Sequence, residues 1–127
     1  MEKLETLLEL ARRKAVIDKT STWSEGAKTY LSELKAEVDE VNEEIANKRV
    51  CFLEDELGDV LWDYLNALVA LEEEQGINIE SVLTRSLSKY NERILGIENG
   101  ESWQEIKSRQ KRALEHEQAN LEQNKYG

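Results

Sequence analysis

Apolar side chains recur at helical spacing along almost the whole chain. In the first stretch they are separated by steps of three and four residues, at Leu4, Leu7, Leu8, Ala11 and Ala15. Such steps bring side chains onto one face of a helix, so we expect a first helix over about residues 2–18. The polar sequence DKTSTWSEG, which follows it, is typical of a loop.

Two longer apolar patterns predict the second and third helices. From about 26 to 47 the apolar residues form one narrow seam, at Leu31, Leu34, Val38, Val41 and Ile45. After a short break at NKRV, a third helix is expected from about 51 to 75. Its apolar residues cover much more than one stripe, at Leu57, Val60, Leu61, Trp62, Tyr64, Leu65, Leu68, Val69 and Leu71. Much of the second half of this helix should therefore be buried on several sides.

Capping signals mark the last two helices. In EEQGINIE, Gly76 fits a C-terminal cap and Asn78 an N-terminal cap, which predicts a fourth helix from about 79 to 95. The sequence SWQE matches a capping box, so a fifth helix should run from about 103 to 122. This last segment contains few apolar residues, and we expect it to be solvated or to lie across a neighbouring subunit.

These elements describe an all-α bundle of four to five helices. At 127 residues the chain has the length of one domain, and we expect a single domain over 1–127 with a polar C-terminal helical tail from about residue 98. Four other short helices can hardly cover a third helix that is apolar nearly all round. A second copy of the chain would cover it, so we expect a homodimer at least, with the core completed by dimerisation. The alternative is a monomeric bundle with this helix at its centre.

Composition agrees with an all-α fold and limits where the chain is expected. There is no proline and there are only six glycines, which favours helices with few sharp turns. The single cysteine, Cys51, excludes an intramolecular disulfide, and the apolar runs are shorter than the ~18 to 20 residues of a membrane span. The N-terminus lacks the apolar segment of a secretory signal. We therefore expect a cytoplasmic protein that does not bind membranes.

The net charge of −10 argues against nucleic acid as a partner, because binding to DNA or RNA relies on Lys and Arg residues that neutralise phosphates. A phosphorylated small molecule is a different case. Divalent metal held by protein carboxylates reverses the local charge, so an acidic protein can still bind a polyphosphate.

Acidic residues form a row of their own on the second helix and another on the third. The first row lies one residue ahead of the apolar seam, and so about 100° around the helix from it, at Glu33, Glu37, Glu40 and Glu44. The second row consists of Glu56, Asp59, Asp63 and Asn66. Both rows are therefore expected at the edge of the core.

Two antiparallel helices joined by a short connection face each other. Glu37 and Glu40 would then lie across from Glu56 and Asp59. Four carboxylates that converge at the edge of a core repel each other strongly unless they bind cations. Oxygen-only ligands suit Mg²⁺ or Mn²⁺, and Mg²⁺ in particular often takes part of its coordination shell from a substrate phosphate.

Other polar features of these helices have separate interpretations. Asp63, one turn beyond Asp59, would orient the site or bind at its rim. Gly58, which costs about 1 kcal/mol against alanine in a helix interior, is best explained by close approach of another helix beside the site. Any acid taken alone fits a solvated helix face, and we expect this of Glu33, Asp39, Glu43 and Glu44.

Several other kinds of site are excluded by residue type. With one histidine and one cysteine, the chain lacks the ligands of a zinc site and the partners of Cys/His nucleophilic catalysis. A ferritin-like di-iron bundle needs two Glu-x-x-His pairs. There is no phosphate-binding G-x-x-x-x-G-K-[ST] loop and no EF-hand loop. The single histidine, His116, is expected at the surface.

The paired acids resemble a known family signature. Glu37-x-x-Glu40 and Glu56-x-x-Asp59, with fifteen residues between them, are similar to the E-x-x-E and E-x-x-D motifs of the MazG-like all-α nucleoside triphosphate pyrophosphohydrolases. DELGDVLWDYL is close to the second motif of that family. TWSEGAKTYLSELKAEVDEV resembles the stretch that leads into the first motif, and SKYNERI resembles a segment that carries a lysine and an arginine. The likeness covers about residues 20–95.

The resemblance implies an activity and a cofactor. Members hydrolyse a nucleoside triphosphate, often a deoxynucleotide, between the α and β phosphates, giving the monophosphate and pyrophosphate. A role in house-cleaning of the nucleotide pool follows, with Mg²⁺ as the cofactor, Mn²⁺ as its substitute, and a homodimer or homotetramer as the assembly. Glu37, Glu40, Glu56 and Asp59 would be the catalytic residues that hold the metal.

The resemblance also points to substrate-binding residues. Lys89 and Arg93 would neutralise phosphate charge, the alternative being two exposed basic residues. Trp23 would stack on the base or close its loop over the core, and Trp62 would lie in the core or a dimer interface. Two other functions remain open. One is a narrow dUTP- or dCTP-specific hydrolase of the same superfamily, and the other is a non-catalytic helical adaptor whose acids bind a partner or a structural cation.

Overall fold

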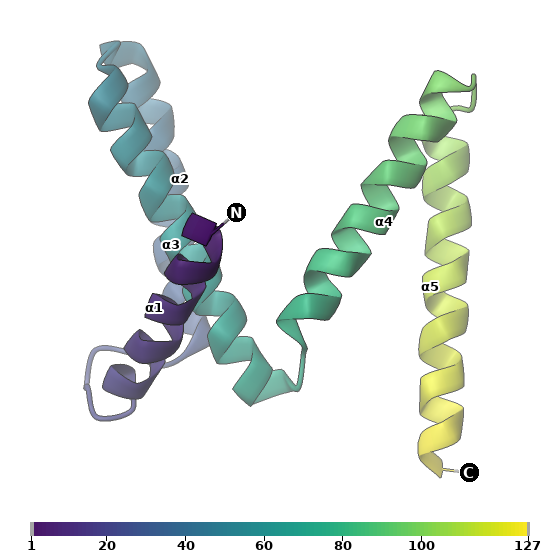
Figure 1. Ribbon diagram of the computed structural model, residues 1–127, viewed down its shortest axis with the longest axis horizontal. Helices are drawn as coiled ribbons and strands as arrows, with labels where there is room; N and C mark the ends of the chain where they lie inside the picture. The colour runs from purple at the N-terminus through teal and green to yellow at the C-terminus, as the bar shows by residue number, and fades with distance from the viewer. Residues whose placement is uncertain (1, 127) are drawn as a thin grey trace. The chain divides into compact units, whose positions relative to one another are not determined.

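The computed structural model describes residues 2–126, and within them the chain is entirely helix and connecting turns (Figure 1). The helices are α1 (Glu2–Asp18), α2 (Ala27–Asn47), α3 (Val50–Gln75), α4 (Ile79–Glu98) and α5 (Trp103–Tyr126). The all-α fold and all five predicted helices are confirmed, with the last two longer than expected at their C-terminal ends. The chain divides into two compact units, Met1–Ile79 and Glu80–Gly127.

The first unit is built on a hairpin of α2 and α3, with α1 packed against α3 (Figure 1). Two residues, Lys48 and Arg49, connect the hairpin helices, so these run antiparallel. Lys48 has the left-handed backbone conformation, with φ 54° and ψ 40°. The core of this unit consists of the buried side chains Ala11, Ala27, Tyr30, Leu65, Ala67, Leu68, Val69 and Ile79.

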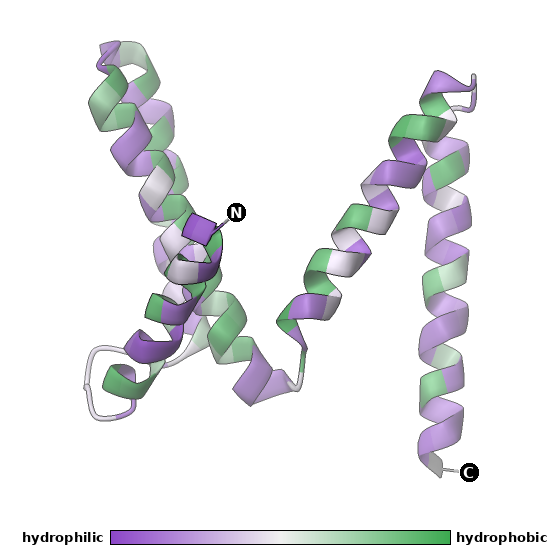
Figure 2. Ribbon diagram, in the orientation of Figure 1, coloured by the Kyte–Doolittle hydropathy of each residue, from purple (hydrophilic) through white to green (hydrophobic). Residues whose placement is uncertain are grey.

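Helix α3 differs between its two halves. Its second half contains an unbroken buried run, Leu65 to Val69, as its apolar sequence predicts, because α1 and α2 both pack against this helix. Its first half exposes Leu57, Leu61 and Tyr64. Helix α2 likewise exposes Leu31, Val38 and Ile45. Figure 2 shows the hydrophobic positions along these two helices.

The start of α2 is fixed to the end of α3. The side chain of Glu74 accepts a hydrogen bond from the backbone N–H of Ala27, with 2.8 Å between the heavy atoms, which satisfies one of the free N–H groups at the helix start. Gly26 has a φ of 83°, and a Cβ there would collide with the Glu74 carboxylate. Gly76 ends α3 in the left-handed conformation, with a φ of 71°, as its sequence position predicts.

The second unit consists of α4 and α5, which are joined by a turn at residues 99–102. Ser102 Oγ accepts a hydrogen bond from the Glu105 N–H, so the expected N-terminal cap of α5 is present. Ile106 is fully buried and packs where Gly96 leaves no Cβ in its way. Most of α5 beyond this point is exposed, His116 included, as predicted for the polar tail.

Within residues 2–126, none of the helices combines the length and the hydropathy of a membrane-spanning segment.

Candidate metal centre

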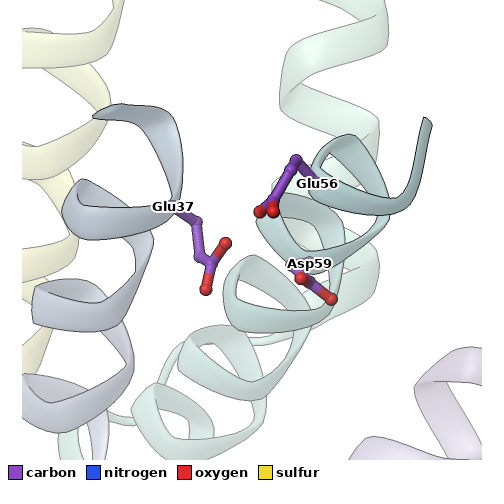
Figure 3. A group of neighbouring side chains, drawn as sticks. All are labelled: Glu37, Glu56 and Asp59. Carbon is purple, nitrogen blue, oxygen red and sulfur yellow. The ribbon is translucent and has the colours of Figure 1, made fainter. Parts of the chain in front are cut away.

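Three carboxylates from two helices meet beside the α2–α3 hairpin. Glu37 lies on α2, and Glu56 and Asp59 lie on α3. One oxygen atom from each lies within 4.8 Å of the others. Figure 3 shows the Glu37 and Glu56 side chains pointing toward one another across the gap between the helices. This three-carboxylate group is called the cradle below.

The cradle concentrates negative charge where water is partly excluded. Glu37 Oε2 and Glu56 Oε2 are buried, and neither has a hydrogen-bond partner among the described residues. Burial and the neighbouring Glu40 and Glu56 carboxyl groups raise the pKa of Glu37 to about 8. The neighbouring Glu37 carboxyl group lowers the pKa of Glu56, but Glu40, burial and Asp59 outweigh that effect and raise the pKa overall.

Two further carboxylates, Glu40 and Asp59, contribute to the electrostatics of the cradle. Glu40 is exposed, yet its charge raises the pKa of Glu37, Glu56 and Asp59, so its carboxylate is close to the cradle. Burial is the largest cause of the raised pKa of Asp59, followed by the charges of Asp55 and Glu40. The structure thus brings Glu37, Glu56 and Asp59 together, and Glu40 lies close to them but outside the group.

The residues present fit a divalent cation. All of the donors are carboxylate oxygens, which are the ligands that Mg²⁺ and Mn²⁺ prefer over softer groups. The two buried oxygens without partners are the kind of atom that a cation satisfies, and a cation would remove the mutual repulsion that raises these pKa values.

The acid row on α3 continues one turn beyond the cradle. Asp63 is only 8% exposed, and burial, followed by the charges of Glu33 and Asp59, raises its pKa to about 6. Asn66 is also buried, and its Nδ2 donates a hydrogen bond to the Trp62 backbone carbonyl at 2.8 Å. The helical spacing predicted that Asp63 and Asn66 lie in the same row as Glu56 and Asp59. It did not predict the burial of Asp63.

Two expectations near the cradle are wrong. Leaving aside the neighbouring backbone of α3 itself, no described atom lies within 4 Å of a Cβ built on Gly58, so no other helix of the same chain approaches there. Glu44 is not solvated: it is buried, and it accepts hydrogen bonds from Arg49 Nε at 2.8 Å and from Asn47 at 3.1 Å. Arg49 reaches it because the tight turn after α2 reverses the chain.

Trp23 lies in the loop between α1 and α2 and is 51% exposed. Its ring meets the edge of Tyr30, with 5.5 Å between the ring centroids, and the Lys14 Nζ lies 4.7 Å from the centre of the Trp23 ring. The loop is thereby held against α1 and α2, and half of the tryptophan surface stays open to a ligand.

Lys89 and Arg93 lie on α4, in the second unit. Lys89 is exposed. Arg93 is only 6% exposed; its Nε donates to Gln110 Oε1 at 2.8 Å, and its guanidinium lies over the rings of Tyr90 and Trp103. The alternative of an exposed Arg93 is therefore wrong, because α5 covers it.

Comparison with protein families identifies the family of this chain. The model described as the MazG nucleotide pyrophosphohydrolase domain matches residues 25–97, which include the cradle, Glu40, Asp63 and all of α3. Comparisons with curated proteins and with solved structures gave no significant match.

Proposed function

The chain belongs to the MazG nucleotide pyrophosphohydrolase family, and on that premise we propose that it hydrolyses nucleoside triphosphates, principally dNTPs, to the monophosphate and pyrophosphate. The observation that carries the proposal is the cradle, with its two buried and unpartnered carboxylate oxygens. Nucleotide pyrophosphohydrolase activity is the general property of the family. The preference for dNTPs and the cytoplasmic house-cleaning role are parts of the proposal.

Mg²⁺ is the proposed cofactor, with Mn²⁺ as its substitute. Glu37, Glu56 and Asp59 would hold it, with Glu40 close to the cradle. A divalent cation bound there supplies positive charge to the phosphate oxygens and lowers the pKa of water. The chain's own part is to fix the donors: each comes from within a long helix, and packing of α2 against α3 sets their separation.

The carboxylates also handle a proton. With its pKa raised to about 8, Glu37 retains a proton at neutral pH while the cradle is empty of positive charge. A cation held there would favour the ionised form, and Glu37 would then release this proton to solvent. Lys89 and Arg93, from the segment that resembles the family's basic motif, are proposed to neutralise phosphate charge, and Trp23 to contact the base.

We propose that the working form is a homodimer or a dimer of dimers. The exposed apolar residues of α2 and α3 support this, because monomeric proteins rarely expose large contiguous apolar patches.

Purified protein incubated with each dNTP and Mg²⁺ tests the activity. We expect release of pyrophosphate and the monophosphate, measured by a coupled assay and by chromatography. Glu56→Gln should lower kcat by about 100-fold or more. It removes one charged ligand of the cation, and the cation is expected to stabilise the transition state by several kcal/mol. Glu54→Gln is the matched control, since Glu54 is an exposed acid on the same helix.

Products and substrate range separate the proposal from its rivals. Orthophosphate as a product, or no turnover with Mg²⁺ or Mn²⁺, would contradict it. Hydrolysis confined to dUTP or dCTP would replace it by a narrow specificity. A non-catalytic adaptor predicts that Glu56→Gln leaves the biological function intact.

A further inference from the structure

Asp63 is a buried carboxylate that the cradle does not explain. As a whole residue it is 8% exposed, and no hydrogen bond or cation from the described residues acts on its carboxylate, whose oxygens are not among the fully buried unpartnered atoms. Burial of the residue with no cation beside it disfavours the ionised carboxylate. A residue whose ionised form is disfavoured in this way is a candidate for binding a ligand.

The position of Asp63 along α3 is informative. It follows Asp59 by four residues and precedes Asn66 by three, so the three side chains share one face of the helix. The charges of Glu33 on α2 and of Asp59 on the same helix raise the pKa of Asp63, so its carboxylate lies near both. Each step along this row covers about one helical turn, roughly 5 Å.

A pocket lies farther along the same row. Its volume is about 280 Å³, and its lining includes Asn66 and Ala70 of α3, Tyr30 of α2, and Asp18 at the end of α1. Lys14 and Tyr30 both donate hydrogen bonds to Asp18, which fixes this wall of the pocket. The Oδ1 of Asn66 accepts no hydrogen bond from the described residues, so it can serve a ligand.

The order along the hairpin is therefore cradle, Asp63, pocket. A nucleotide has the same order of parts: the α-phosphate is joined through one oxygen and one carbon to the sugar, and the base lies beyond the sugar. A triphosphate held at the cradle brings its sugar to within one helical turn, at the level of Asp63, when its base lies toward Asn66 and the pocket.

We propose that Asp63 is a specificity-determining residue that accepts a hydrogen bond from the 3′-hydroxyl of the substrate sugar. This inference rests on the proposed function, because it takes the phosphates to lie at the cradle. A hydroxyl donor suits the site, since a carboxylate only accepts hydrogen bonds and repels phosphate oxygens. The bond would be charge-assisted and partly shielded from water, which makes it strong.

The other occupant of this position would be a second cation shared by Asp63 and Glu33. Glu33 is exposed and its carboxylate is free to stay in water, so it does not need a cation. The hydroxyl is therefore the better match to a single buried acceptor, and the cation becomes an outcome of the test.

The experiment compares each dNTP with its 2′,3′-dideoxy analogue. In wild type we expect removal of the 3′-hydroxyl to lower kcat/KM by roughly ten- to a hundredfold, the range for a hydrogen bond to a charged group. In Asp63→Ala and Asp63→Asn the ratio should fall to within about threefold, mainly because dNTP is bound less well. Asp39→Asn, an exposed acid on α2, should keep the wild-type ratio.

Direct binding keeps the two proposals distinguishable. Affinities of dNTP and dideoxy-NTP for the Glu56→Gln protein, with and without Asp63→Ala, are measured by calorimetry with Mg²⁺. Binding that depends on the 3′-hydroxyl and on Asp63, without any turnover in wild type, would sustain the inference and overturn the proposed reaction. The inference would be overturned if wild type used both nucleotides equally, or if Asp63→Ala lowered kcat/KM equally for both. It would also be overturned if no nucleotide bound at all, or if Asp63→Asn bound fewer Mg²⁺ ions.

Discussion

At the scale of single residues, the carboxylates of the cradle lower the stability of the folded protein while they provide its proposed metal ligands. Glu37 and Glu56 each keep one buried oxygen without a hydrogen-bond donor, an arrangement that costs free energy in the folded state. A bound cation would give the same oxygens the partner that they lack. Repulsion among the carboxylates is the physical reason for the proposal that the cradle binds a cation, and it should be measurable in the metal-free protein.

The raised pKa of Glu37 predicts how stability depends on pH. In the folded state this group holds its proton up to about pH 8, whereas its ordinary value is 4.5. Between these values the folded state binds more protons than the unfolded state, so the free energy of unfolding falls as pH rises. Thermal denaturation in EDTA from pH 5 to 8 should show this fall, and Glu37→Gln should reduce its slope. Glu54→Gln serves as control, and an unchanged slope in Glu37→Gln would contradict the assignment.

Metal should reverse the trend at the alkaline end. Cation binding requires ionised carboxylates, so added Mg²⁺ should raise Tm more at pH 8 than at pH 5.5, by linkage between binding and folding. A Tm increase of equal size at both pH values, or one that survives in the Glu37→Gln and Glu56→Gln double variant, would place the cation elsewhere.

Residue spacing predicted some of this site and missed the rest for identifiable reasons. Steps of three and four on two antiparallel helices are enough to bring Glu37 toward Glu56 and Asp59, because helical geometry is regular. The burial of Glu44 was not predictable, since it depends on a turn that returns Arg49 onto it. The isolation of Asp63 was equally hidden, because it depends on what packs around α3 rather than on the row itself.

At the scale of elements, the turn between α2 and α3 decides how the acid rows align. Only Lys48 and Arg49 separate the two helices. The left-handed conformation of Lys48, at φ 54°, costs about 1 kcal/mol for a residue with a Cβ. Ion pairing of Arg49 with Glu44, at 2.8 Å, fastens the returning chain to the end of α2.

Lys48→Gly should therefore stabilise the protein. Glycine adopts the left-handed conformation without steric cost and is the preferred residue just after a helix. We expect a gain of about 0.5 to 1 kcal/mol in the free energy of unfolding by chemical denaturation, with activity unchanged. Lys48→Ala is the matched control: it removes the same side-chain charge but keeps the Cβ, so a gain of equal size there would show that charge, not backbone conformation, is responsible.

Helix positions were predictable where a local signal exists. Gly76, in the left-handed conformation after α3, and Ser102, which caps α5, both act through neighbouring backbone groups. The end of α4 was placed too early, at residue 95 instead of Glu98. Gly96 is helical in the structure, and its missing side chain leaves room for Ile106. Such packing involves a residue ten positions away and leaves no local pattern.

At the scale of the whole molecule, the exposed apolar residues of the hairpin raise the question of assembly. In antiparallel helices, residues one position after the facing side chains point to the same side of the pair. Val38 follows Glu37 on α2, and Leu57 follows Glu56 on α3, and both are exposed. This geometry puts Val38 and Leu57 on the same side of the hairpin as each other, next to the cradle, and a second copy of the chain could bury them on a twofold axis.

Leu61→Glu tests this assembly. Leu61 is exposed on α3, and two glutamates brought together across a twofold interface would repel each other and lose the apolar contact. We expect light scattering coupled to gel filtration to show a homodimer or homotetramer for wild type and a monomer for the variant, with helical content by circular dichroism retained. Leu121→Glu, at an exposed leucine of α5, should keep the wild-type mass. A monomeric wild type would mean that the apolar surface serves another partner, and the proposed homodimer would be abandoned.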